Sequence, residues 1–261
     1  ITFKDPFAVG IYCGLSKPNS SNELLKLFVE EFKLISRHGI HIDQLNITVS
    51  LNAIICDAPA KAFILCVKGH QSYSGCSKCC QEGVLQSNHM TYPDTSAVLR
   101  NNGDFANGLY EDYQKEKTIL LEIDGLGLVS QVPLDYMHLI CLGVTKRLIK
   151  FFAHGSKDVR LNQSQLTEID AKILKFRDYI PSEFARLPRS ILEIDKWKAT
   201  ELRLFIFYMG PELLEPFLSP PKYKHFLALH TAVRILACKS LCYRYNQYAK
   251  ELLLYFVNKY G

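Results

Sequence analysis

The feature that most constrains this chain is a Gly-Cys-x-x-Cys-Cys sequence that begins at Gly75. Two cysteines separated by two residues, here Cys76 and Cys79, have the ligand spacing of half of a tetrahedral zinc site. The glycine allows the tight turn that such a knuckle needs, and Ser77 and Lys78 have the polarity of a solvent-facing loop. The spacing predicts bound zinc, with two unpaired surface thiols or a redox pair as the alternatives.

A complete zinc site needs two more ligands, and the sequence has no second Cys-x-x-Cys. The other candidate ligands are His89, His138, Cys141, His225 and His230. His225 and His230 are five residues apart and do not share a helix face well, so packing or surface roles are favoured for these two.

The composition is that of an ordinary globular protein. Of the 261 residues, 48% are apolar and 22% are charged, which is ample material for a core. Nine cysteines without a secretory signal indicate reduced thiols inside a cell, where clustered cysteines favour metal over disulfide. The net charge of +5 weakly favours a polyanionic partner, and no apolar run is long enough to span a membrane. Because the chain begins with Ile1 and ends on an apolar stripe, we expect a piece of a longer product.

The first part of the chain predicts a strand at 7–12, a helix at 23–39 and a second strand at 47–55. This order favours a right-handed crossover and a parallel pair of strands. Asp57 is then expected at the carboxyl end of a buried strand, where open α/β folds usually place their sites.

Asp57 has two interpretations. It caps the helix expected at 58–67 through the N–H of Ala60 or Lys61, or it holds a divalent metal. Position alone favours the cap, and the downstream cysteines strengthen the metal alternative. If Asp57 lies far from any strand end, or if the sulfurs of Cys76 and Cys79 are splayed apart, the interpretation as a metal-dependent nucleic-acid enzyme loses its basis.

The rest of the chain predicts a small α/β half joined to a larger helical half. Residues 85–113 have no periodic stripe and are expected to form a loop or a weakly ordered insert, and residues 181–188 a break. The helices are expected at 134–152, 164–176, 195–209, 223–245 and 247–260.

Three further features of this helical half have both a functional and a structural interpretation. Asp135 and His138 are expected to share a helix face, either as a carboxylate that orients a structural histidine or as a zinc ligand with its supporting acid. Glu201 is an acid on an apolar helix, for which a solvated, salt-bridged face is favoured over catalysis. The basic residues of 186–203 are interleaved with Trp197 and could follow a phosphate backbone, although a wet surface is the favoured interpretation.

Three segments together resemble the CACTA-type transposases and related proteins of animal transposable elements. The segments, DAPAKAFILCVKGHQSYSGCSKC, VPLDYMHLICLGVTKRLIKFF and PSEFARLPRSILEIDKWKATELRLFIFYMGP, cover residues 57–79, 132–152 and 181–211. The resemblance implies an α/β fold with a partial RNase H-like sheet, a large helical insertion and a zinc knuckle. It implies a partial core at 1–70, a Cys-rich knuckle and loop at 71–115 and the helical insertion at 116–261.

The resemblance also implies roles for individual residues. Asp57 matches the second acid of a DDE triad that binds catalytic Mg²⁺, and Cys76 and Cys79 match the first half of a structural zinc site. Asp135 and His138 match a motif to which we assign no role. The first and third acids of the triad are expected outside the chain, so it is expected to lack activity alone.

The implied function is that of the central fragment of a nuclear DDE-type transposase. The intact protein would bind transposon-end and target DNA, hydrolyse a phosphodiester and transfer the strand, with homo-oligomerisation possible in principle. Two alternatives remain open: a domesticated, non-catalytic, zinc-stabilised module that binds DNA or protein, and an unrelated zinc-stabilised interaction domain in which Asp57 is only a cap.

Overall fold

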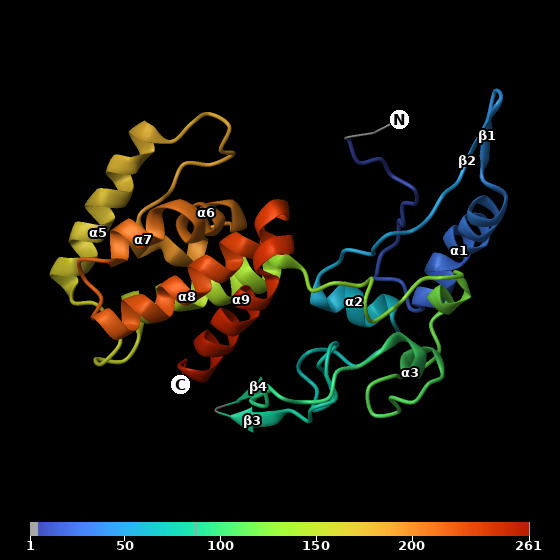
Figure 1. Ribbon diagram of the computed structural model, residues 1–261, viewed down its shortest axis with the longest axis horizontal. Helices are drawn as coiled ribbons and strands as arrows, with labels where there is room; N and C mark the ends of the chain where they lie inside the picture. The colour runs from blue at the N-terminus through green and yellow to red at the C-terminus, as the bar shows by residue number, and fades with distance from the viewer. Residues whose placement is uncertain (1–4, 87, 261) are drawn as a thin grey trace. The chain divides into compact units, whose positions relative to one another are not determined.

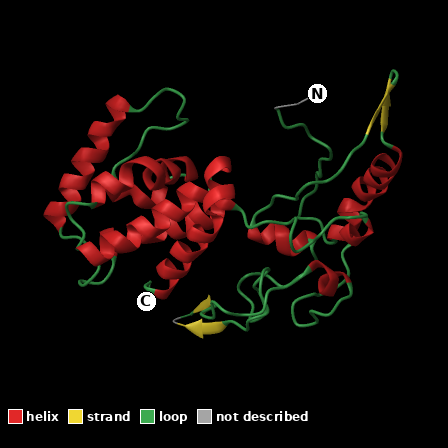
Figure 2. Cartoon of the chain, in the orientation of Figure 1, coloured by secondary structure: helices red, strands yellow, loops and turns green. Residues whose placement is uncertain are grey.

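The protein folds as two compact units, Ile1–Asp135 and Tyr136–Gly261, in a computed structural model that describes residues 5–86 and 88–260. Each unit has its own hydrophobic core. The two small sheets belong to the first unit, and the second unit is helical (Figures 1 and 2). The Cys-rich segment expected at 71–115 belongs to the first unit, whose boundary falls after Asp135.

The first unit combines short helices and hairpins with long irregular segments. Its elements are α1 (Ser21–His38), β1 (Ile40–Ile42), β2 (Leu45–Ile47), α2 (Ala58–Ile64), β3 (Val84–Gln86), β4 (His89–Thr91), α3 (Asn102–Ala106) and the 3₁₀ helix η1 (Ile119–Glu122).

Helix α1 confirms the helix expected at 23–39. Ser20 caps its start by accepting a hydrogen bond from the N–H of Glu23, and Gly39 ends it with a φ of 74°. A residue with a Cβ is strained at such a φ, which is why the helix stops at this glycine. Val29 and Phe32 bury the inner face of the helix in the core of the first unit.

The expected parallel pair of strands was wrong. The two sheets of the described residues are antiparallel hairpins, β1 with β2 and β3 with β4. Residues 7–12 form no strand, and after β2 the chain runs to residue 57 without one. The segment between β2 and residue 57 forms its hydrogen bonds with Gln131. The carbonyl of Gln131 accepts from the N–H of Ile54 at 2.9 Å, and its side-chain amide donates to the carbonyls of Leu51 and Asn52. The apolar runs at 7–12 and 47–55 therefore did not suffice to predict strands, because neither run has a neighbouring strand with which to pair.

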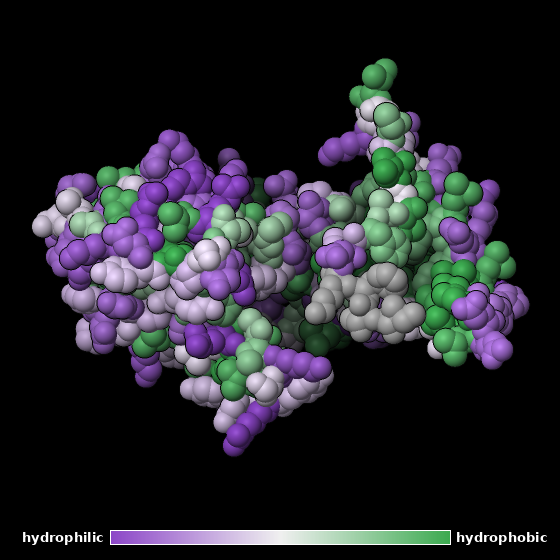
Figure 3. All heavy atoms as spheres, turned by 90° about the horizontal axis from the view of Figure 1, so that it is seen from above, coloured by the Kyte–Doolittle hydropathy of each residue, from purple (hydrophilic) through white to green (hydrophobic). Residues whose placement is uncertain are grey.

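The core of the first unit draws on irregular segments as much as on helices. Leu65 and Val67 follow α2, while Leu120, Val129 and Val132 come from the segment that includes and follows η1. Large hydrophobic side chains also lie on the surface of this unit: Phe7, Ile11, Leu27 and Ile55 are between 77% and 87% exposed. Figure 3 shows hydrophobic atoms among the hydrophilic ones on one face of the molecule.

The second unit is a helical assembly around one large core. Its elements are the π-helix η2 (Met137–Thr145), α4 (Lys146–His154), α5 (Gln163–Phe176), η3 (Arg177–Tyr179), η4 (Ile191–Lys196), α6 (Ala199–Leu204), the π-helix η5 (Phe205–Met209), α7 (Gly210–Leu214), α8 (Pro220–Leu236) and α9 (Lys239–Asn258).

Several helices of this unit differ from their predicted bounds. The helix expected at 195–209 begins only at Ala199 and does not end at Gly210. It continues as α7, because a proline in the first turn of a helix removes no hydrogen bond that the helix needs. The break expected near residue 246 lies instead between α8 and α9, and Tyr245 marks only a kink.

The core of the second unit is built on aromatic side chains. The rings of Trp197 and Phe205 meet edge to face with centroids 6.1 Å apart, and those of Phe205 and Phe226 at 6.3 Å. Helices α8 and α9 pack against each other (Figure 1), with Ala232 and Ala249 buried between them. The aromatic contacts and the α8–α9 packing together hold the helices of this unit in place.

Candidate metal centre

The cysteine knuckle lies between α2 and β3, and glycine is required where it begins. A Cβ atom built on Gly75 would lie 2.6 Å from the hydroxyl of Tyr92 and 2.9 Å from the carbonyl oxygen of Ser72. The Tyr92 hydroxyl itself donates to that carbonyl at 2.6 Å. The turn that precedes Cys76 is therefore tight, as the sequence predicts.

The two thiols of the knuckle converge. The Sγ atoms of Cys76 and Cys79 are 3.1 Å apart, well beyond the length of about 2.05 Å that a disulfide requires. The N–H of Cys79 donates to Sγ of Cys76 at 3.3 Å, so the backbone already turns toward the first sulfur. Two sulfurs that bind one tetrahedral zinc at about 2.3 Å each would lie about 3.8 Å apart, so the two thiols would have to separate slightly to share a metal ion.

The surroundings of the pair favour one thiolate. Burial acts to raise the pKa of Cys79, but hydrogen bonds from the side chain and backbone of Gln81 and from Cys76, together with the charge of Arg100, outweigh it and lower the pKa. Burial, followed by the interaction with Cys79, raises the pKa of Cys76. Cys79 therefore ionises first, and a thiolate is the form of cysteine that binds metal.

Residues 98–100 hold the knuckle in place. The N–H of Cys80 donates to the carbonyl of Val98 at 2.9 Å, and the N–H of Arg100 to that of Lys78 at 2.9 Å. The Arg100 side chain donates from Nε to the carbonyl of Cys76 at 3.0 Å, while its guanidinium lies over the rings of Tyr110 and Tyr113. Sequence reasoning missed Arg100, because it stands in a segment without periodicity, far along the chain from the cysteines.

Lys78 does not face solvent as expected. Its Nζ donates to the carbonyls of Val129 and Val132, the latter at 3.0 Å. Lys61 on α2, 6% exposed, donates to the carbonyl of Pro133 at 2.7 Å. Burial lowers the pKa of both amines. The knuckle and α2 are thus both tied to the segment 129–133.

The described part of the chain shows no complete metal site. In residues 5–86 and 88–260, no three His, Cys, Asp or Glu side chains are grouped so that they could hold a metal ion. The candidate histidines of the second unit serve its packing: His225 Nε2 pairs with the carbonyl of Phe256 at 2.8 Å, and His230 Nδ1 with that of Ile206 at 2.6 Å. His89 lies exposed at the start of β4, and His138 and Cys141 lie on η2.

Asp57 caps a helix and does not end a strand. Its Oδ1 accepts a hydrogen bond from the N–H of Ala60 at 2.7 Å, at the start of α2. The preceding strand, β2, ends ten residues earlier at Ile47. The expected placement at a strand end was wrong, and the capping interpretation is confirmed.

Asp135 lies in the same region as Asp57. Burial raises the pKa of the Cys56 thiol, Lys61 lowers it, and the charges of Asp57 and Asp135 both raise it further. Asp135 directly precedes the helical residues that begin at Tyr136, and His138 lies on η2.

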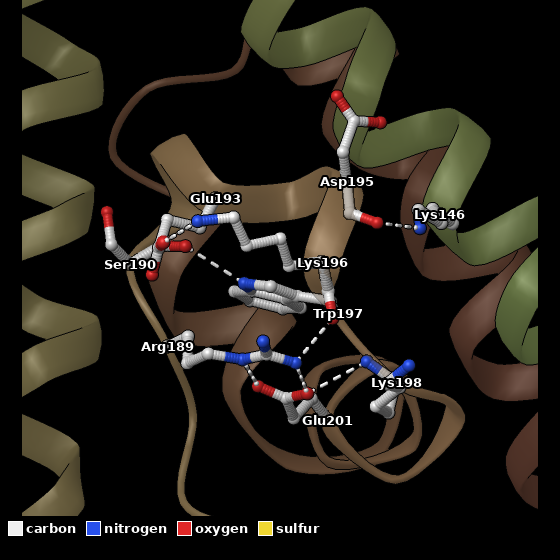
Figure 4. A network of polar contacts seen from close by, with 9 residues as sticks. All are labelled: Lys146, Arg189, Ser190, Glu193, Asp195, Lys196, Trp197, Lys198 and Glu201. Atoms are coloured by element: carbon white, nitrogen blue, oxygen red, sulfur yellow. Dashed lines mark hydrogen bonds and ion pairs between the residues drawn. The ribbon is translucent and has the colours of Figure 1, made fainter.

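Glu201 is buried and belongs to a structural network (Figure 4). Arg189 binds both of its carboxylate oxygens, with Nε to Oε1 at 2.8 Å and Nη2 to Oε2 at 2.6 Å. The backbone N–H of Lys198 donates to Oε2 at 2.8 Å. The expected solvated face was therefore wrong, and both carboxylate oxygens accept hydrogen bonds from these donors.

The same network removes the basis for phosphate tracking along 186–203. Trp197 is 1% exposed and donates from Nε1 to the carbonyl of Ser190 at 2.9 Å, so its ring is not available to stack on a base. Lys196 is paired with Glu193 at 2.7 Å. This segment supplies internal structure more than a binding surface.

Comparison with known protein families, with characterised proteins and with solved structures finds no match. Among the helices of the described ranges, none combines the length and the apolar character needed to cross a bilayer.

Proposed function

We propose that this chain is the central portion of a DDE-type DNA transposase, to which it contributes a zinc-stabilised framework and DNA contacts. The observation that supports the proposal best is the convergence of the Cys76 and Cys79 sulfurs, 3.1 Å apart on a loop pinned by Arg100. The spacing of these thiols and their place after Asp57 match the transposase-like motif of the sequence. A DNA substrate would place the protein in the nucleus.

The two cysteines fit half of a structural zinc site. The only acid proposed for Mg²⁺ in this chain, Asp57, fits a magnesium site poorly. Cys76 and Cys79 would hold zinc, with the remaining ligands supplied from outside this pair. Asp57 is a weaker candidate for Mg²⁺, since its Oδ1 accepts the capping hydrogen bond at 2.7 Å. In the parent protein, Mg²⁺ bound by three acids, an RNase H-like arrangement, would supply the activation needed for phosphodiester hydrolysis and strand transfer. Because Asp57 caps α2 and lies at no strand end, the proposal rests on the cysteine knuckle and the sequence motifs and not on Asp57 as a catalytic acid.

A second candidate function is a domesticated module that retains the fold and zinc without catalysis. The observation that favours it is the position of Asp57, which the capping of α2 explains completely. The two candidates predict the same zinc content for this chain, and the same binding to DNA if the module binds DNA and not protein. They differ in the acids that the flanking sequence encodes, and reading that sequence separates them.

The test is a measurement of zinc and DNA binding by the 261-residue chain. We expect one zinc per chain by elemental analysis, with the metal lost in a Cys76→Ser, Cys79→Ser double variant and retained in Cys80→Ser. We expect salt-sensitive binding to duplex DNA and no strand transfer in Mg²⁺. A metal-free wild type would contradict the framework role, and robust strand transfer by this chain would contradict the assignment of an incomplete catalytic centre.

A further inference from the structure

A groove runs over the second unit along η2 and α4, with the end of α9 beside it. It consists of three adjoining hollows of about 810, 490 and 520 Å³. Tyr260 lines the first and second of these hollows, Arg147 the second and third, and Phe151 the first and third. From Gly143 to Gly155 the groove follows 12 residues of helix, about 18 Å at 1.5 Å per residue. That length matches about five stacked bases at 3.4 Å each.

The groove is lined by positive charge. The cationic residues among those that line it are Lys146, Arg147, Lys150, Lys222 and Lys259. The only carboxylate among the described lining residues is that of Asp195, which pairs with Lys150 at 2.8 Å. This excess of cations makes the groove complementary to a polyanion.

Aromatic rings form the wall of the groove. The ring of Tyr260 lies 6.0 Å from that of Phe151 and 5.4 Å from that of Phe256, on which His225 stacks at 4.3 Å. The guanidinium of Arg147 lies over the Phe151 ring at 5.5 Å. Tyr260 is 38% exposed, so part of its ring is open to solvent. Flat, partly exposed rings beside cations are the combination by which proteins hold unpaired nucleotides.

We propose that this groove binds a single strand of DNA, with Arg147 and Lys259 near phosphates and Tyr260 and Phe151 against bases. A single strand fits better than a duplex, because a duplex hides the base faces that the rings would contact. The inference deepens the proposed function and rests on its DNA substrate, but it depends on neither zinc nor Asp57. It gives the helical unit a role in holding a strand that has been separated from its partner.

The test measures the affinity of the 261-residue chain for a fluorescein-labelled 12-nucleotide oligo(dT) by anisotropy. Arg147→Gln and Tyr260→Leu should each weaken binding by about tenfold, since stacking and phosphate contacts both contribute at that scale. The matched controls are Arg177→Gln and Tyr179→Leu, which change exposed residues of η3 outside the groove and should stay within about twofold of wild type. Arg147→Lys should retain most of the affinity, and Arg147→Gln should reduce the slope of log K against log salt by about 0.7. Circular dichroism melting of each variant confirms that it is folded.

Separate outcomes overturn the inference and the proposed function. Groove variants that bind oligo(dT) as wild type does would overturn the groove, even if the chain binds zinc and duplex DNA. Equal affinity of the wild type for a 12-base-pair duplex would overturn the preference for a single strand. A wild-type dimer that Tyr260→Leu converts to a monomer in sedimentation would mean that a second copy fills the groove. Groove-dependent binding by a chain without zinc would support the inference while contradicting the zinc framework.

Discussion

Replacement of Glu201 by glutamine should destabilise the helical unit strongly while keeping the shape of the side chain. The carboxylate accepts three hydrogen bonds, two from Arg189 and one from the N–H of Lys198, at 2.6 to 2.8 Å. A glutamine presents an amide N–H₂ to at least one of these donors, so a buried contact becomes repulsive. Breaking a buried ion pair costs about 3–5 kcal/mol. Because the Arg189 side chain is 32% exposed and water can solvate it, the lower end of this range, about 3 kcal/mol, is expected.

The assay is urea unfolding followed by tryptophan fluorescence, since the single Trp197 lies in the core of this unit beside the ion pair. With a denaturant slope of about 2 kcal/mol per molar, a loss of 3 kcal/mol moves the midpoint down by about 1.5 M. The control is Glu168→Gln, which removes an exposed pair with Lys172 on α5 and should cost about 0.5 kcal/mol or less.

The pH dependence gives a second measurement of the same contact. Burial acts to raise the pKa of Glu201, but the hydrogen bonds from Arg189 and from the backbone of Lys198 outweigh it and lower the pKa below its ordinary value of 4.5. A carboxyl whose folded-state pKa is lowered stabilises the fold above its unfolded pKa, and that contribution is lost as the pH falls through the folded pKa. The wild-type unit should therefore lose stability below about pH 4.5, and Glu201→Gln should lose less. A variant with the wild-type midpoint and the wild-type acid sensitivity would refute this account of the ion pair.

Three further predictions concern the first unit. Asp57→Ala should lower the free energy of unfolding by about 1 kcal/mol through loss of the α2 cap, whereas Asp57→Asn should retain most of it, as thermal unfolding would report; equal effects would argue against capping. Cys79→Ser should abolish the thiolate-to-Co²⁺ absorption of a cobalt-substituted chain, and Cys80→Ser should leave it intact, so loss in both variants would contradict the assignment of ligands. Gly75→Ala should weaken metal binding because its Cβ would meet the backbone carbonyl oxygen of Gly69 and the Tyr92 hydroxyl, while Gly69→Ala, with open space around the added atom, should not. Competition with a chelator measures both, and equal affinities would show that the turn is not tight.

Local signals in the sequence were the ones that could be read correctly. The helix at 23–39 was predictable because its cap, its apolar stripe and its terminal glycine are all local, and the Asp57 cap was predictable for the same reason. The helix at 164–176 was likewise correct, since Asn162 caps α5 in a capping box with Gln165.

Features that depend on distant residues were not predictable in the same way. The apolar run at 47–55 looked like a buried strand, but its partner is Gln131, about 80 positions away along the chain. Glu201 looked solvated because its ion-pair partner, Arg189, stands outside its own helix. The half-buried position of Lys78 is likewise set by carbonyls more than 50 residues away. In each case the decisive contact is long-range, and no local period reports it.

The passage from η2 into α4 makes this part of the chain tolerant of the loss of one residue. In η2 each turn closes on the fifth residue, and from Lys146 onward on the fourth, so a π turn holds one residue more than an α turn. Deleting one residue from η2 would let one of its turns close on the fourth residue, and the rotational phase of α4 would change little. Leu148 and Phe152 would stay in the core and Arg147 at the groove, whereas deleting one residue at the start of α4 would rotate the residues that follow by about 100°.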